Sequence, residues 1–216
     1  MTIQCLLFDN DGTLVDSEYL CNLGIAEQFA LLGVHLDVDT LVKSYRGGKL
    51  SEIFAEIACK NGVEIPSNFV PQYRKRVAAL FDEKLAPIAG IKNALSRLHY
   101  TKAVVSNGPR AKVEYALSLC KLTHYFDQRV YSAYDVGIFK PNPEIYLYAA
   151  RELGFKPYEC VVVEDSITGV TAGSKANMLT LFYNVHNEPV NLPNVYSFSD
   201  MRKLPLLIEK LSTRAV

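Results

Sequence analysis

The sequence has no excess of charge of either sign. Its 216 residues include 23 Lys and Arg and 23 Asp and Glu, so the formal net charge is zero. Proteins that bind nucleic acid through its phosphates normally show a basic excess or a basic stripe, and neither is present here. The composition therefore argues against a nucleic-acid partner, whereas 49% hydrophobic and 21% charged residues are typical of a globular chain with a buried core.

Long apolar runs are also missing. No stretch reaches the ~18 consecutive apolar residues of a membrane span, and the opening run, residues 3–8, ends at Asp9. The same run is too short for a secretory signal and lacks a basic start. We therefore expect a cytoplasmic protein with no membrane partner, and a monomer, since nothing in the sequence requires a second copy.

Cysteine and histidine do not form metal-binding patterns. The five cysteines are odd in number, scattered and never in a CxxC pair, and the four histidines have no ligand spacing. A disulfide framework or a zinc site is therefore disfavoured. We expect reduced thiols that pack as small apolar groups.

Short apolar runs alternate with helical patterns over most of the chain. The expected strands are residues 3–8, 103–105, 161–163 and 179–182. The expected helices between the later runs are residues 111–120, 143–153 and 168–176. Strand alternating with helix predicts an α/β fold with a Rossmann-like parallel sheet.

One long segment, residues 16–85, interrupts this alternation. It has no convincing strand and carries repeated helical faces, which predict a small helical bundle. The breakers Pro87 and Gly90 mark the return to the alternating pattern. We therefore expect an α/β core made of residues 1–15 and 86–216, and an inserted α-helical cap made of residues 16–85.

Reactive side chains follow the expected strands. Ligands of an open parallel sheet bind beyond the carboxyl ends of its strands, so these side chains should meet in one cleft. They are Asp9 and Asp11 after the first run, Ser106 and Asn107 after the second, Lys140 in a later loop, and Glu164 and Asp165. Clustered carboxylates repel one another, and a hard cation such as Mg²⁺ is the natural compensation. Together with Lys140, such a site would hold a phosphoryl group.

Each of these segments also has a structural explanation when it is taken alone. The stretch from Asp9 to Gly12 is a common turn sequence, and it resembles the start of a calcium-binding loop. The calcium interpretation is weak because the twelfth loop position is Leu20, where a bidentate Glu is needed. The functional interpretation is favoured because the segments occur together, in order, each at a strand end.

The chain resembles the haloacid dehalogenase superfamily, in the branch with a helical cap inserted after the first strand. The four motifs that carry the resemblance are Asp9-x-Asp11-Gly12-Thr13, Ser106-Asn107, Lys140-Pro141-x-Pro143 and Glu164-Asp165. The resemblance covers essentially the whole chain. One departure is Asn177-Met178, where the family usually has a Gly, and Asn tolerates the same left-handed backbone.

The resemblance implies a role for each motif residue. Asp9 would be the nucleophile, and Asp11 the general acid and then the general base. The Mg²⁺ ligands would be Asp9, the backbone carbonyl of Asp11, and Asp165, with Glu164 beside them. The phosphoryl group would be held by Ser106, Asn107 and Lys140.

Different reactions occur in this superfamily, and three positions help to separate them. Dehalogenases lack the second aspartate, so Asp11 argues against them. Hexose-phosphate mutases of this branch usually have Val where this chain has Thr13, and a His where it has Cys21. These differences favour a phosphatase, with a sugar phosphomutase or a non-catalytic phosphometabolite-binding protein as the alternatives.

The cap is expected to set the substrate. Arg46 and Lys49 flank a flexible Gly pair, and residues 45–53 resemble the cap of bacterial 6-phosphogluconate phosphatases. Either cation would suit the carboxylate of a sugar-acid phosphate. A second basic group, residues 74–76, is typical of a solvated helix face. We therefore expect Mg²⁺-dependent hydrolysis of a small phosphate monoester, a sugar or sugar-acid phosphate such as 6-phosphogluconate, through an aspartyl-phosphate.

Overall fold

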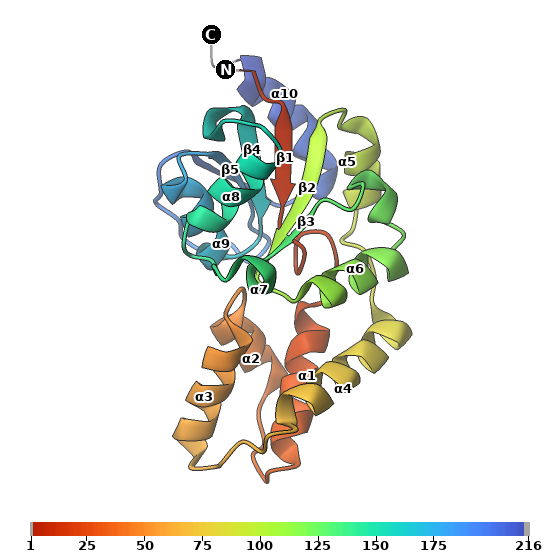
Figure 1. Cartoon of the computed structure of the whole chain (residues 1–216), viewed down its shortest axis with the longest axis vertical. Helices are drawn as coiled ribbons and strands as arrows, with labels where there is room; N and C mark the ends of the chain where they lie inside the picture. The colour runs from red at the N-terminus through yellow and green to blue at the C-terminus, as the bar shows by residue number, and fades with distance from the viewer. Residues whose placement is uncertain (1, 214–216) are drawn as a thin grey trace.

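A parallel six-stranded sheet forms the centre of the computed structural model, which describes residues 2–213 (Figure 1). The strand order is β3-β2-β1-β4-β5-β6. The strands are β1 (Cys5–Phe8), β2 (Thr101–Ser106), β3 (Val130–Ser132), β4 (Cys160–Glu164), β5 (Leu179–Tyr183) and β6 (Val195–Phe198). Because β1 lies between β2 and β4, the reactive ends of these three strands are neighbours.

Helices cover both faces of the sheet, which explains why its central strands are continuous apolar runs rather than alternating ones. Leu6 and Phe8 belong to one buried cluster, which also contains residues from one set of helices. Leu7 belongs to the opposite cluster, with residues from a second set. The first set is α5 (Ile91–Arg97), α6 (Arg110–Leu119) and α10 (Leu204–Thr213), and the second is α8 (Glu144–Glu152) and α9 (Ile167–Lys175). The predicted Rossmann-like α/β fold is confirmed.

Several elements were not predicted from the sequence. Strand β3 has only three residues, and β6 has no buried residue, so neither produces a long apolar run. The helices α5 and α10 were not predicted either. The remaining unpredicted elements are α7 (Ala133–Val136) and three 3₁₀ helices at Thr123–Tyr125, Pro157–Glu159 and Met201–Lys203.

Four helices follow β1 and lie together at the end of the molecule below the sheet (Figure 1). They are α1 (Glu18–Ala30), α2 (Val38–Tyr45), α3 (Leu50–Asn61) and α4 (Phe69–Lys84). An aromatic cluster packs edge to face inside them, with Phe54 in contact with Phe29, Phe69 and Tyr73 at centroid distances of 5.1–5.8 Å. We refer to this group of helices as the cap and to the sheet with its covering helices as the core.

The chain enters and leaves the cap at neighbouring points. Asp16 donates its backbone N–H to Ala86 at 2.9 Å, and Val15 and Pro87 form an isolated bridge. Buried cap side chains continue the apolar cluster that covers one face of the sheet. The cap is therefore seated over the carboxyl ends of the strands.

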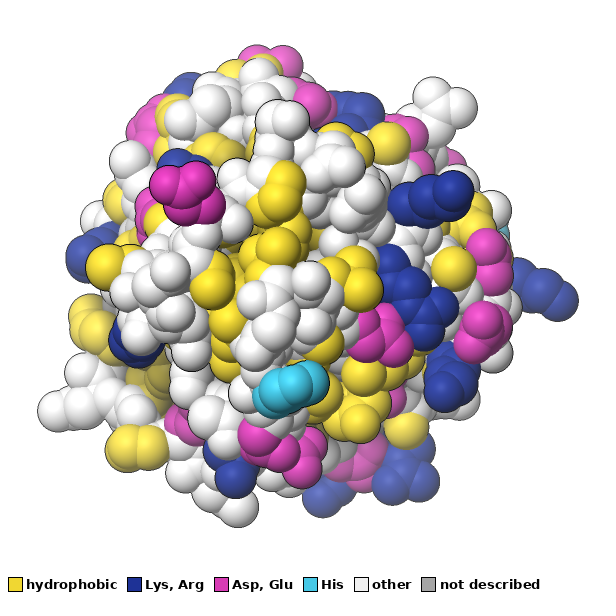
Figure 2. Space-filling model, turned by 90° about the horizontal axis from the view of Figure 1, so that it is seen from below, with side chains coloured by type: hydrophobic (Ala, Val, Ile, Leu, Met, Phe, Trp, Pro, Cys, Tyr) yellow, Lys and Arg dark blue, Asp and Glu magenta, His cyan; other side chains and the backbone are white. Residues whose placement is uncertain are grey.

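The surface of the cap end agrees with the balanced composition. Acidic and basic side chains are interspersed there, with apolar side chains between them, and they do not form one field of a single charge (Figure 2). None of the helices within residues 2–213 is both long and apolar enough to cross a bilayer.

Candidate active site

The carboxyl ends of β1, β2 and β4 open into a cavity of about 400 Å³ between core and cap. Six of the predicted core residues line it: Asp9, Asp11, Ser106, Asn107, Lys140 and Asp165. Glu164 lies behind them and is fully buried. Residues that are up to 156 positions apart in the sequence thus meet where the topology of the sheet predicts.

Lys140 is the central cation of the core side. Its Nζ donates to Asp9 Oδ1 at 2.5 Å, to Glu164 Oε1 at 2.6 Å and to the backbone oxygen of Val105 at 2.8 Å. Burial opposes its charge, but the two carboxylates outweigh burial and raise the pKa of Lys140. The ammonium group therefore stays charged beside the carboxylate of Asp9.

Glu164 is occupied on both of its oxygens. Tyr146 donates its hydroxyl to Oε1 at 2.9 Å, and Ser166 donates its hydroxyl to Oε2 at 3.1 Å. A Cβ added at Gly169 would lie 1.8 Å from Oε1, so only glycine fits beneath this carboxylate. We infer that the main role of Glu164 is to hold Lys140 in place, and not to contact a ligand.

Asp165 lies against the turn that follows β1. Thr13 donates its hydroxyl to Asp165 Oδ1 at 3.1 Å. Gly12 has a positive φ of 78°, and a Cβ there would lie 2.1 Å from Asp165 Oδ2. Burial, reinforced by the negative charges of Glu18 and Asp9, raises the pKa of Asp165 well above its usual value.

The core residues fit a divalent cation. Asp9, Glu164 and Asp165 each offer an oxygen, and these oxygens lie within 4.8 Å of one another. Burial, followed by repulsion from Glu164, raises the pKa of Asp9 to about 7 in spite of Lys140. A second cation would relieve this repulsion, and hard carboxylate oxygens are the ligands that Mg²⁺ prefers. Asp9 and Asp165 are the better placed ligands, because Glu164 is already hydrogen-bonded on both oxygens.

Asp11 is held apart from that cluster by two residues that sequence reasoning missed. Lys112 Nζ lies 2.7 Å from Asp11 Oδ1, and the Ser17 hydroxyl donates to the same oxygen. Burial opposes ionisation of Asp11, but Lys112 and Ser17 outweigh it and lower its pKa. The carboxylate of Asp11 is therefore not one of the three clustered oxygens, and its backbone carbonyl is the group that the resemblance assigns to the metal. Lys112 lies in the first turn of the helix that follows Ser106 and Asn107, which is the signal that could have found it.

Ser106 and Asn107 organise the part of the cavity at the end of β2. Ser106 Oγ accepts the N–H of Gly108 at 2.9 Å, and Asn107 Oδ1 accepts the N–H of Lys140 at 2.9 Å. Asn107 Nδ2 also donates to the backbone oxygen of Gly47 in the cap at 3.2 Å. Asn107 therefore joins two core loops and the cap in one hydrogen-bonded group.

The two cap cations predicted to bind substrate lie in different environments. Arg46 lines the cavity, but its side chain is only 8% exposed and pairs with Glu188 at 2.8 Å and Glu18 at 3.6 Å. Lys49 is not among the residues that line the cavity within the described chain. Its ammonium group lies 4.8 Å from the ring centroid of Phe139. The structure therefore separates a pair that the sequence grouped.

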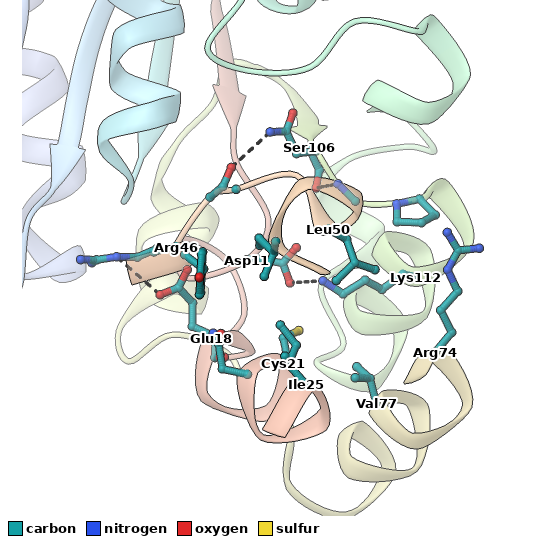
Figure 3. Close-up of a pocket in the computed structure, with 18 of the residues that line it drawn as sticks. Asp11, Glu18, Cys21, Ile25, Arg46, Leu50, Arg74, Val77, Ser106 and Lys112 are labelled. Carbon is teal, nitrogen blue, oxygen red and sulfur yellow. Dashed lines mark hydrogen bonds and ion pairs between the residues drawn. The ribbon is translucent and has the colours of Figure 1, made fainter. Parts of the chain in front are cut away.

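The second basic group is also divided. Arg76 pairs with Glu27 inside the cap, at 2.6 and 3.0 Å. Lys75 is exposed. Arg74 lines the cavity, on the side of Asp11 away from Arg46 (Figure 3). The interpretation as a solvated helix face therefore agrees with the exposure of Lys75 and Arg74, although Arg74 also lines the cavity, whereas Arg76 is half-buried.

Comparison with known proteins connects this arrangement to a family. A family model described as haloacid dehalogenase-like hydrolase matches residues 6–183. The 6-phosphogluconate phosphatase of Escherichia coli (strain K12) is 34% identical over 208 residues, which cover 95% of this chain and 94% of that protein. A haloacid dehalogenase-like protein of unknown function from Agrobacterium tumefaciens str. C58 has a TM-score of 0.81 at 26% identity, over 97% of this chain and 99% of the other.

A third similarity concerns the fold alone. The β-phosphoglucomutase of Clostridium difficile has a TM-score of 0.84 and covers 99% of this chain and 98% of its own, at 20% identity. The same architecture of sheet and cap therefore occurs in an enzyme named for a different reaction. The reaction has to be argued from the side chains of the cavity.

Proposed function

Since the chain belongs to the haloacid dehalogenase-like hydrolases, we propose that this phosphatase hydrolyses a sugar or sugar-acid phosphate through an aspartyl-phosphate on Asp9. The observation that carries the proposal is the convergence on one cavity of Asp9, Asp11, Lys140 and Asp165. A nucleophile, a proton carrier and a cationic seat for phosphate are the parts that phosphoryl transfer requires.

In the first step an oxygen of Asp9 attacks phosphorus, and the bond from phosphorus to the substrate oxygen breaks. Lys140 and the Ser106 hydroxyl are placed to donate to the phosphoryl oxygens, whose negative charge grows in the transition state. Asp11 supplies the proton that the leaving oxygen needs. Lys112 favours the ionised form of Asp11, and an arriving phosphate group would raise the pKa of Asp11 by repulsion, so that it can carry this proton.

In the second step a water molecule attacks the same phosphorus atom. Asp11, now ionised, accepts a proton from that water. The bond between phosphorus and the Asp9 oxygen breaks, and inorganic phosphate leaves with the regenerated carboxylate behind it. The hydrogen bond between Asn107 and Gly47 keeps the cap against the phosphate side of the core during both steps.

Mg²⁺ is the cofactor that we propose for this site. When bound, it would neutralise charge on the phosphoryl group and on the surrounding carboxylates. Asp9, Asp165 and the backbone carbonyl of Asp11 would hold it, with Glu164 acting from behind through Lys140. Support comes from the closeness of the three buried carboxylates and from the raised pKa of Asp9.

The proposed substrate class is supported by the relative named 6-phosphogluconate phosphatase, which this chain matches over nearly its full length. The test is a panel of phosphorylated metabolites, containing sugar phosphates, sugar-acid phosphates and an aryl phosphate. Each would be measured for phosphate release with Mg²⁺ and with a chelator. We expect the highest kcat/KM for a sugar or sugar-acid phosphate, and reversible loss of activity with the chelator.

The same panel separates the alternatives. A sugar phosphomutase would convert one sugar phosphate to its isomer with little release of inorganic phosphate. A non-catalytic binding protein would release none from any compound. Either result would reject the proposed phosphatase reaction.

A further inference from the structure

We propose that Arg74 binds a carboxylate at the end of the substrate remote from phosphorus, and so determines a preference for sugar-acid phosphates. This inference rests on the proposed phosphatase function. It assigns the distal contact to a cap residue other than Arg46 and Lys49, the two that the sequence favoured.

The cations that line the cavity differ in whether they already have an acidic partner. Three of them are already paired with carboxylates: Lys140 with Asp9 and Glu164, Lys112 with Asp11, and Arg46 with Glu18 and Glu188. Arg74, the fourth, has no ion pair with any acidic residue of the described chain. A ligand carboxylate can therefore bind Arg74 without displacing an existing partner.

Arg74 lies where the cap meets the core. It projects from α4 in the cap, and its guanidinium lies 5.7 Å from the ring centroid of Tyr134, which belongs to α7 in the core. In the close-up view, Arg74 and Arg46 lie on opposite sides of Asp11 (Figure 3). A substrate whose phosphate sits at the carboxyl ends of the strands can extend from there toward Arg74.

The wall on the cap side of the cavity is apolar near Arg74. Ile25, Val77 and Phe81 line the cap side of the cavity, with Cys21 beside them. An anionic group placed against such a wall gains no hydrogen bond from it and needs a cation at its edge. A guanidinium offers two parallel N–H donors that match the two oxygens of a carboxylate, and the Tyr134 ring helps to fix its plane.

The chain supplies its own control variants. Lys75 is the next residue on the same helix, is exposed, and is not among the residues that line the cavity within the described chain. Lys49 carries the competing hypothesis, since the sequence favoured it as the carboxylate partner. Substitution of either residue removes one positive charge from the cap, as substitution of Arg74 does.

The experiment compares two substrates that differ only at the distal end. One is 6-phosphogluconate, and the other is the hexitol 6-phosphate that has a hydroxymethyl group in place of the carboxylate. Their kcat/KM values are measured with Mg²⁺ for the wild type and for Arg74→Ala, Arg74→Lys, Lys75→Ala and Lys49→Ala. Circular dichroism of each variant checks that the fold is kept.

We expect the wild type to prefer the acid, and Arg74→Ala to lower that preference by about 10- to 100-fold, the effect of losing a hydrogen bond to a charged group. The loss should arise mainly in KM for the acid. Arg74→Lys should recover part of the preference, and Lys75→Ala should keep it.

Other results would reject the inference. It is wrong if Arg74→Ala keeps the wild-type preference, if Lys49→Ala alone abolishes it, or if the wild type hydrolyses both compounds equally well. In those three cases the phosphatase reaction itself stands. If the wild type releases phosphate from neither compound nor from an aryl phosphate, the proposed function has failed, and the role of Arg74 fails with it.

Discussion

The core side and the cap side of the cavity are lined by different kinds of side chain. On the core side Lys140 is paired with both Asp9 and Glu164, and these three groups are almost completely buried. On the cap side the wall is mostly apolar, and Arg74, which has no ion pair within the described residues, is exposed at its edge. In the proposed function the core side supplies the groups for phosphoryl transfer, and the cap side supplies the surface that meets the rest of the substrate.

This difference has a physical basis. Buried charges are stable only with their partners in place, so a change on the core side disturbs several groups at once. An apolar wall tolerates exchange of one hydrophobic side chain for another of similar size. Substitutions in the core should therefore abolish the reaction, whereas substitutions in the cap should change its substrate.

The largest effect is expected from removal of the nucleophile. Asp9→Asn keeps the shape of the side chain but cannot form an aspartyl-phosphate, so kcat for every substrate should fall by about 10⁴-fold or more. Steady-state phosphate release measures this, and circular dichroism checks the fold. Appreciable turnover by the variant would show that another group attacks phosphorus.

Lys140→Met should have the largest effect on stability. It leaves Asp9 and Glu164 buried without their cation, which should cost about 3–5 kcal/mol in the free energy of unfolding at neutral pH. The cost should shrink as the pH falls, because protonation removes the uncompensated negative charge. Urea unfolding measures both effects. Lys75→Met, the matched loss of an exposed cap cation, should change stability by less than about 0.5 kcal/mol, and an equal cost in both variants would contradict the account.

Gly12 in the core and Gly33 in the cap have the same φ angle, so substitution of each by Ala compares the two regions directly. Gly12 and Gly33 both have a φ of 78°, but a Cβ at Gly12 would lie 2.1 Å from Asp165, and one at Gly33 would have no atom within 4 Å. Substitution by Ala strains both turns by about 1–2 kcal/mol. Only Gly12→Ala should also displace Asp165, which we expect to lower kcat/KM by about 100-fold.

Activity and thermal unfolding of the two glycine variants separate these contributions. Gly33→Ala should lose stability but keep its activity. If both variants lose activity to the same degree, contact with Asp165 is not the cause.

The smallest expected effect concerns pH and the metal. The raised pKa of Asp9, about 7, means that below this pH the folded protein holds a proton on a proposed metal ligand. A cation must displace that proton, together with any proton held by Asp165, whose pKa is also raised. The affinity for Mg²⁺ should therefore weaken by at least about tenfold for each pH unit below about 7. Calorimetric titration in buffers with different ionisation enthalpies measures both the affinity and the released proton. Affinity that does not change with pH would contradict the proposed ligand set.

The sequence predicted well those elements whose pattern is contained in one short stretch of the chain. The central strands are uniform apolar runs because both faces are buried. The turn residues come directly after these runs in the sequence. Strands β3 and β6 were missed because three residues, or a strand without a buried residue, leave no such run. The positions of Asp9, Ser106 and Asp165 at one cavity follow from parallel topology, whereas Lys140 reaches it from the loop between α7 and α8.

Partnerships between distant side chains could not be predicted in the same way. Lys112 pairs with Asp11 across 101 positions in the sequence, and Arg46 pairs with Glu188 across 142. Nothing in the spacing of charged residues shows which cation is already neutralised and which is free. That is why Arg46 and Lys49 looked like the better ligands for a carboxylate, and why Arg74 looked like part of a solvated helix face.

In the proposed reaction Asp9 itself accepts the phosphoryl group. This can be checked by mixing the enzyme with Mg²⁺ and substrate, quenching rapidly in acid, and locating the phosphoryl group by mass spectrometry of the digested protein. We expect one phosphoryl group, carried by the peptide that contains Asp9 and absent from the Asp9→Asn variant. A phosphoryl group on another residue, or turnover with no phosphoenzyme at any quench time, would contradict it.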